Sequence, residues 1–142
     1  MSTEENKAVI RRFWEAVNQG YLNALDDTLA ASYKGRMPGL EPLDCAGVKD
    51  VVAQYRSAFP DLHVTIDDMI AEGDKVATRF TITGTHQGDL MGLAPTGKPM
   101  TVSGVTVMRF RDGKVAEEWE QVDMMSMMQQ LGAMPSPAQA PA

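Results

Sequence analysis

The chain has 142 residues, the size of a single domain, and 44% of them are hydrophobic, enough for a core that needs no covalent or metal support. A formal net charge of −6 argues against binding to nucleic acid or to anionic membranes, since both require a basic patch. No apolar run approaches the ~20 residues of a membrane span, and the start MSTEENK is too acidic for a signal peptide. We therefore expect a cytoplasmic protein. With Cys45 as the single cysteine and with only His63 and His86, the sequence predicts no disulfide framework and no metal centre.

The first part of the chain has the periodicity of helices. Apolar residues recur three and four positions apart, with charged residues between them. A glycine- and proline-rich loop separates the second predicted helix from the third. The predicted features are a capping box at Ser2 and Glu5, a stop at Gly20, a second helix from Tyr21 to Ala31, a short strand from Tyr33, and a third helix capped by Asp44 and ended by Pro60.

The second part alternates with the period of strands. Helices followed by strands indicate an α+β domain in which the helices pack on one sheet. Gly84 and Gly104, in mid-strand, favour a strong bend, so we expect a cone whose interior is a small-molecule pocket. The predicted strands are Leu62–Glu72, Lys75–Gln87, Met100–Arg111 and a last strand ending at Asp123, with turns at Gly73-Asp74 and Asp112-Gly113. A Met-rich helix ends the predicted domain, which spans residues 1–132. The Pro- and Ala-rich tail 133–142 is predicted to be disordered.

The last strand supplies the strongest candidate for chemistry. Strict alternation places Val115, Glu117, Trp119, Gln121 and Asp123 on one face, which would be the polar floor of the pocket. An apolar pocket raises the pKa of a carboxyl group toward neutrality, so Asp123 could act as a general acid or base. The alternative is that Asp123 only caps the helix that follows it.

Other side chains could assist at such a site. His86, at the end of its strand, could orient a substrate oxygen or carry a proton, or it could belong to a polar rim. Trp119 could stack on a flat substrate beside Gln121, and a core position is an equal alternative. Tyr33 and Arg36 could close over the pocket mouth, although ordinary loop surface is the favoured interpretation for both.

Several common motifs are missing from the sequence. It contains no glycine-rich nucleotide motif, no GxSxG and no zinc-ligand spacing. If the protein is an enzyme, we therefore expect it to need no cofactor and to work by proton transfer.

Four segments together resemble one family. The motifs GTHxG, PTGK, RFxDGK and ExWxxxD occur in series, and the similarity covers nearly the whole predicted domain. On these motifs the chain resembles the SnoaL-like polyketide cyclases of the NTF2-like superfamily. The segments are FPDL (Phe59 to Leu62), Glu72 to Gly88, Leu93 to Asp123, and QQLG (Gln129 to Gly132).

The resemblance implies an α+β cone that forms a homodimer or homotetramer through its sheet. It also implies cofactor-free chemistry on a hydrophobic, carbonyl-rich small molecule, with Asp123 as the general acid/base of an intramolecular aldol closure. Two alternatives stay open on the same fold. One is an epoxide hydrolase or hydroxylase-like enzyme, and the other is a non-catalytic module for ligand binding or dimerisation.

Overall fold

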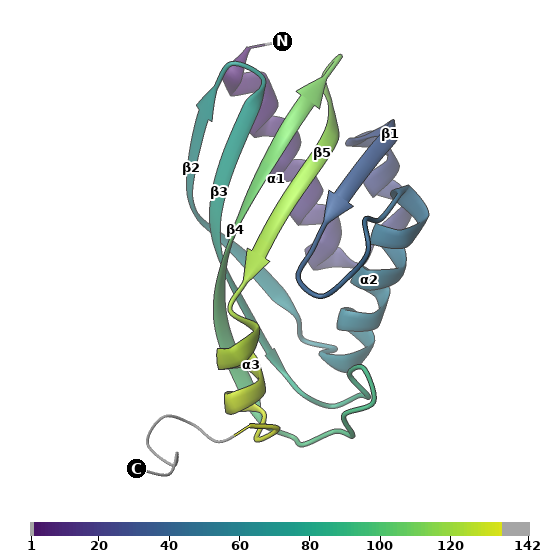
Figure 1. The fold of residues 1–142 in the computed structure, drawn as a ribbon, viewed down its shortest axis with the longest axis vertical. Coiled ribbons are helices and arrows are strands. Elements are labelled where there is room, and N and C mark those ends of the chain that lie inside the picture. Colours follow the sequence, from purple (N-terminus) through teal and green to yellow (C-terminus); the bar gives the residue numbers. More distant parts are fainter. Residues whose placement is uncertain (1, 135–142) are drawn as a thin grey trace.

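A five-stranded sheet forms one wall of the protein, and helices cover one of its two faces (Figure 1). The computed structural model describes residues 2–134. The helices precede most of the strands in the chain, which confirms the expected α+β class. The elements are α1 (Thr3–Gln19), the 3₁₀ helix η1 (Leu22–Asp27), β1 (Leu29–Arg36), α2 (Cys45–Ala58), β2 (His63–Glu72), β3 (Lys75–Thr85), β4 (Pro99–Arg111), β5 (Lys114–Val122) and α3 (Met124–Gln130).

The sheet has the strand order β1-β5-β4-β3-β2. Strands β2 to β5 are antiparallel neighbours in chain order, whereas β1 pairs with β5 in parallel. The sheet curves around the helices without closing on itself, and α3 continues from the end of β5 at one end of the molecule (Figure 1). The arrangement is the predicted cone with an open sheet.

The helix ends follow from their capping residues. Glu5 N–H donates to Ser2 Oγ at 3.0 Å, and Ser2 N–H donates to Glu5 Oε1 at 3.2 Å, which completes the predicted capping box. Gly20 ends α1 with a φ of 72°, a conformation that glycine adopts at little cost. Asp44 caps α2 by accepting the Gly47 N–H at 2.8 Å. These three features were predicted from sequence and are confirmed.

The second predicted helix is wrong in length. Helix was expected over 21–31, but η1 ends at Asp27 and the chain is already a strand at Leu29. Leu29 is the Cα partner of Val115 on β5. Pairing with a strand so distant in the chain overrides the local helical pattern, because propensity is a weak prior against tertiary contacts.

The inner face of the sheet carries the core. Trp14 of α1 lies 5.0 Å from Phe80 of β3, ring centre to ring centre, and 4.9 Å from Phe13. Phe80 packs closely over Gly104 of β4, where a Cβ atom would lie only 2.6 Å from the ring. Alternate residues along β3 and just after it face the helices. They are Val76, Thr78, Phe80, Ile82, Gly84 and His86, all buried or half-buried.

Residues 135–142 lie outside the described part of the chain, and most of the predicted disordered tail lies there. The domain boundary at residue 132 therefore stays a prediction. Among residues 2–134, no helix combines the length and apolar character needed to cross a membrane.

Candidate functional site

Strand β5 contains a β-bulge near its start. In the β4–β5 ladder, Phe110 pairs with Val115 but Arg109 pairs with Glu117, which leaves Ala116 as an extra residue. Val115 and Ala116 are both buried, although they are adjacent in the strand. The bulge therefore reverses which residues of β5 face the helices from this point onward.

The prediction of which face of β5 forms the pocket floor is wrong beyond the bulge. Glu118 is fully buried on the helix-covered side, and Glu120 follows it on the same side. Trp119 is 37% exposed, and Gln121 is exposed, on the uncovered side. An uninterrupted period of two would have given the opposite assignment.

An apolar pocket lies between the inner face of the sheet, α1, α2, α3 and the loop after β1. Its cavity volume is about 100 Å³, below the ~300 Å³ at the lower end of pockets for drug-sized ligands. Several methionines belong to its wall, and unbranched thioether side chains adapt readily to an irregular guest. The lining residues are Phe13, Trp14, Val17, Met37, Pro38, Leu40, Val48, Val52, Tyr55, Leu62, Val64, Ile82, Glu118, Glu120, Val122, Met124 and Met127.

The only charged groups among these lining residues are two carboxyls. Glu118 and Glu120 project from alternate positions of β5 into a wall that is otherwise apolar or aromatic. None of the described lining residues is Lys, Arg or His. Within residues 2–134, no group of three or more His, Cys, Asp or Glu residues is placed to hold a metal ion. The two carboxyl groups are thus the acidic side chains that the described part of the pocket wall presents to a guest.

Glu118 is held by two hydroxyl groups. The Tyr33 hydroxyl donates to Glu118 Oε1 at 2.6 Å, and the Thr106 hydroxyl donates to Glu118 Oε2 at 3.1 Å. Tyr33 is only 3% exposed and is not a lining residue, so both predicted places for it, the favoured loop surface and the pocket mouth, are wrong. Its ring points into the core because β1 lies beside β5 in the sheet, which brings Tyr33 against Glu118.

Burial shifts the ionisation of both glutamates. Desolvation raises the pKa of Glu118, and the two hydroxyl donors offset part of that rise. Desolvation, followed by the negative charge of Glu118, raises the pKa of Glu120 to about 8. A carboxyl group that titrates near neutrality in an apolar pocket can give or take a proton, as general acid/base catalysis requires.

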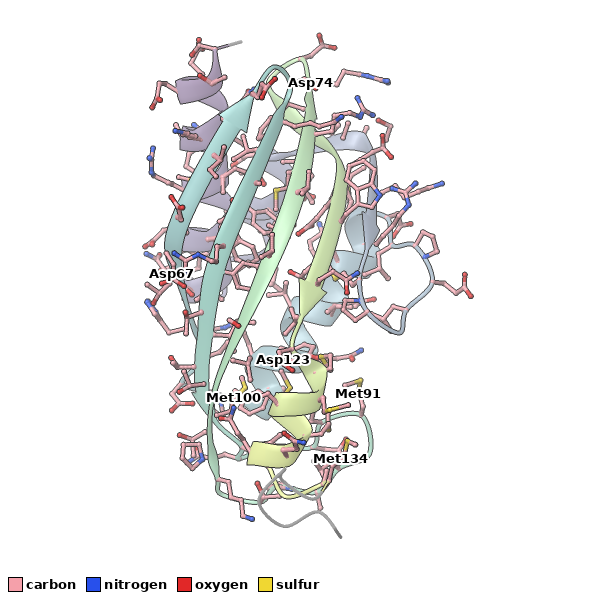
Figure 2. The ribbon with its side chains drawn as sticks, turned by 60° about the vertical axis from the view of Figure 1, so that its left-hand side comes forward. Asp67, Asp74, Met91, Met100, Asp123 and Met134 are labelled. Carbon is pink, nitrogen blue, oxygen red and sulfur yellow. The ribbon has the colours of Figure 1, made fainter. Side chains whose placement is uncertain are left out.

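Asp123 lies at the rim of this pocket. Its neighbours Val122 and Met124 line the cavity, but its own side chain is exposed. Figure 2 shows it where β5 passes into α3. The Asp123 carboxylate accepts the Ser126 N–H at 3.0 Å, so it caps α3. The expected dry enclosure of Asp123 is wrong, because its carboxylate is exposed at the start of α3. Its role in catalysis stays a prediction.

Arg36 and Trp119 meet on the uncovered side of the sheet. The Arg36 guanidinium lies 5.2 Å from the centre of the Trp119 ring, in a cation–π contact. Arg36 also pairs with Glu117 at 3.0 Å, and Arg109 pairs with Glu117 at 2.7 Å. Hydrogen bonds from Arg109 and then Arg36 lower the pKa of Glu117. Three predicted substrate-binding residues, Arg36, Trp119 and Gln121, therefore lie across the sheet from the pocket.

His86 is buried in a second apolar cluster with Phe59 and Met100. Its Nδ1 accepts the Thr96 N–H at 3.2 Å. It is not among the residues that line the pocket. The structure thus places His86 as an anchor for the loop after β3 and does not bring it to the two glutamates.

Sequence reasoning missed Glu118 and Glu120 because it assumed an unbroken strand. The available indication was the adjacent apolar pair Val115 and Ala116, which alternation cannot bury on one face without a bulge. Shifting the phase by one position after Ala116 places both glutamates inside.

Comparisons with known proteins agree with this fold. The family model for SnoaL-like polyketide cyclases matches residues 8–131. A curated relative is the aklanonic acid methyl ester cyclase AcmA of Streptomyces galilaeus. It is 27% identical over 137 residues, which cover 90% of this chain and 91% of the relative.

Solved structures give the same result. AclR of Streptomyces galilaeus, which is proposed to be a hydroxylase, is 32% identical with a TM-score of 0.86. The match covers 95% of this chain and 85% of the AclR chain. IdmH of Streptomyces antibioticus, proposed to be a polyketide cyclase, is 33% identical with a TM-score of 0.81. The match covers 89% of this chain and 98% of the IdmH chain. The family match spans most of the sequence and includes every element that builds the pocket. The chain belongs to the SnoaL-like polyketide cyclase family.

Proposed function

We propose that this protein is a cofactor-free enzyme of the polyketide cyclase type, acting on a hydrophobic, carbonyl-rich and uncharged small molecule. The observation that carries the proposal is the carboxyl of Glu120 inside an apolar pocket, with Glu118 beside it and no basic side chain among the described lining residues. An ionised carboxylate on the guest would be repelled there. AcmA is named as a cyclase of a methyl ester, which is consistent with an uncharged substrate.

The proposed step is an intramolecular aldol closure. A base removes a proton from a carbon next to a carbonyl, the resulting enolate forms a carbon–carbon bond to a second carbonyl of the same molecule, and an acid protonates the alkoxide. With a pKa of about 8, Glu120 has both its forms populated near neutral pH. One side chain can therefore accept the proton from carbon and return it to oxygen.

Asp123 is the second candidate for this role. The resemblance to the cyclases points to it, and its position at the rim leaves it within reach of a guest that extends beyond the cavity. Its carboxylate, however, is exposed and occupied by the N–H of Ser126. The enclosed setting of Glu120 is better suited to holding a proton at neutral pH.

Two isosteric variants separate these candidates, with turnover of aklanonic acid methyl ester as the assay. We expect Glu120→Gln to lower kcat by roughly 100-fold or more, the usual contribution of a general acid/base. Asp123→Asn keeps a good helix cap, so we expect it to fold normally and to lose much less activity. Loss of activity in Asp123→Asn alone would transfer the role to Asp123, and full activity in both variants would refute carboxyl-mediated proton transfer.

A hydroxylase is the second candidate function, and the likeness to AclR favours it. The pocket would then bring molecular oxygen, as the oxidant of a hydroxylation, or water, as the nucleophile of an epoxide hydrolysis, to the guest beside Glu120. Ring closure leaves the elemental composition of the substrate unchanged, whereas hydroxylation and epoxide hydrolysis both add oxygen. Mass spectrometry of the product, made in ¹⁸O-labelled water and under ¹⁸O₂, distinguishes all three reactions.

We also propose that the protein forms a homodimer through the uncovered face of the sheet. Three apolar side chains from three strands are exposed there: Ile70 is 67%, Val105 45% and Trp119 37% exposed. Apolar residues gathered on one sheet face are a common feature of protein interfaces.

A further inference from the structure

The two pocket glutamates differ in their hydrogen bonding. Both carboxyl oxygens of Glu118 accept a hydroxyl donor, from Tyr33 at 2.6 Å and from Thr106 at 3.1 Å. Within residues 2–134, the Glu120 carboxyl has no such donor. Hydrogen bonds to a carboxylate favour its ionised form, so the charge is more stable on Glu118 than on Glu120.

The Tyr33 hydroxyl reaches Glu118 across a glycine. A Cβ atom on Gly35 would overlap the Tyr33 hydroxyl and would lie 2.9 Å from Tyr33 Cζ. The backbone of Gly35 meanwhile exchanges two hydrogen bonds with Leu43, each 2.8 Å long. The absence of a side chain at position 35 therefore makes room for the hydroxyl, and an added methyl group would displace it without removing those backbone bonds.

No opposite charge competes with this arrangement among the described residues around the pair. Helix α1 contributes Phe13, Trp14 and Val17 to the pocket wall, and α3 contributes Met124 and Met127. The other ionisable groups facing the pair are phenols, Tyr33 from β1 and Tyr55 from α2. The thiol of Cys45, on α2, lies near Tyr33, and burial raises its pKa. Burial raises the pKa of both phenols, so both stay neutral. Desolvation acts on both carboxyls, and the hydroxyl donors are the groups that favour the charge on Glu118.

We propose that Tyr33 is a positioning residue: its hydroxyl, seated over Gly35, keeps the negative charge of the pair on Glu118 and so leaves the proton on Glu120. Two carboxyls that share a site cannot both ionise easily, and the one with more donors ionises first. The inference rests on the proposed function, since it explains why the proton carrier of that function is Glu120. It also means that Tyr33, which is buried and does not line the cavity, influences the protonation of a residue that does.

The test is a pH titration of the substrate-free protein by NMR. Glutamate labelled with ¹³C at the side-chain carboxyl reports each ionisation directly, and the variants Glu118→Gln and Glu120→Gln assign the two signals. In the wild type we expect Glu118 to titrate in the lower step and Glu120 in the upper step, near pH 8. The variant is Tyr33→Phe, which removes only the hydroxyl. The matched control is Tyr21→Phe, because Tyr21 is 64% exposed and does not line the pocket.

In Tyr33→Phe, we expect the lower step to rise by about one to two pH units, the effect of one hydrogen bond to a charged group. Because the charge is then shared between the two carboxyls, the chemical shifts of both glutamates should change in that lower step. Gly35→Ala retains the hydroxyl but displaces it, so it should shift the titration in the same direction and serves as a second variant if Tyr33→Phe folds poorly. A titration in both variants that matches Tyr21→Phe would overturn the inference, as would a wild-type upper step that belongs to Glu118. Because no substrate is present, this outcome is independent of whether Glu120→Gln abolishes turnover.

Discussion

Glu118 is fully buried and Glu120 is half-buried in the wall of an apolar pocket. Their energetic consequence differs from that of the surface carboxylate Glu117, which has two arginine partners. A paired surface charge changes stability little, whereas a buried carboxyl without a cation favours its neutral form. The folded state of this protein therefore holds protons that the unfolded chain would release.

This proton uptake predicts a stability that falls as the pH rises. The folded pKa of Glu120 is about 8, against an ordinary value of 4.5, so between these values the folded protein binds more protons than the unfolded chain. The free energy of unfolding should then decrease between pH 5 and pH 9, by on the order of a few kcal/mol. Urea unfolding across this range measures the effect, and Glu120→Gln should flatten the profile. A wild-type profile as flat as that of Glu120→Gln would contradict the prediction.

Single residues could be predicted from sequence where their role is local. The capping residues Ser2 and Asp44 act on N–H groups three positions away, and the sequence alone identified both. The roles of Glu118 and Tyr33 depend on a partner 85 positions away. Asp123 illustrates the same limit. Its helix cap, a local contact, was among the predicted alternatives, whereas its exposure was not predicted.

Among the elements, β5 determines the site. One inserted residue, Ala116, exchanges the faces of the strand, so that glutamates line the pocket and Trp119 faces outward. Alternation in the sequence predicted the strand itself and its turn at Asp112-Gly113 correctly, but a bulge is specified by pairing with β4. The phase of a strand is therefore less predictable than its existence.

Strand β4 supplies a second test at this scale. A Cβ atom on Gly104 would lie 2.6 Å from Phe80 and 2.8 Å from the Gln121 carbonyl oxygen, part of the backbone. We expect Gly104→Ala to lower the free energy of unfolding by about 1–3 kcal/mol, the typical cost of overpacking. Ser103→Ala, at the exposed neighbouring position, is the control and should change little. Equal stability of the two variants would show that Phe80 can move away at no cost.

At the scale of the whole molecule, one face of the sheet holds the pocket and the other is free for contact. Helices before strands in the chain were enough to predict the α+β class, because each layer must bury its apolar side against the other. The parallel place of β1 beside β5 was not predictable in the same way, since it pairs the first strand of the chain with the last. That pairing is also the reason why the second helix is shorter than predicted.

The proposed homodimer gives a prediction for the uncovered face. Val105 lies on β4, the central strand of the sheet, and is 45% exposed. We expect Val105→Lys to convert a dimer into a monomer, measured as a halved mass by light scattering after size-exclusion chromatography, because a lysine would be buried against the partner. The control is Leu40→Lys, which is 44% exposed and lies at the pocket instead. A monomeric wild type, or a Val105→Lys variant that remains dimeric, would refute this interface.

The pairing of β1 with β5 has a consequence for synthesis on the ribosome. The first strand can pair with β5 only after Val115, the partner of Leu29, has been synthesised. The hydrogen bond from Tyr33 to Glu118 joins residues that are similarly far apart in the chain. The three-stranded meander β2–β3–β4 can assemble earlier, with α1 against it, but the acidic wall of the cavity forms only when translation is nearly finished. Because such distant contacts close slowly, we expect β1 to join the sheet last and to be the first strand to exchange its amide hydrogens when the protein opens.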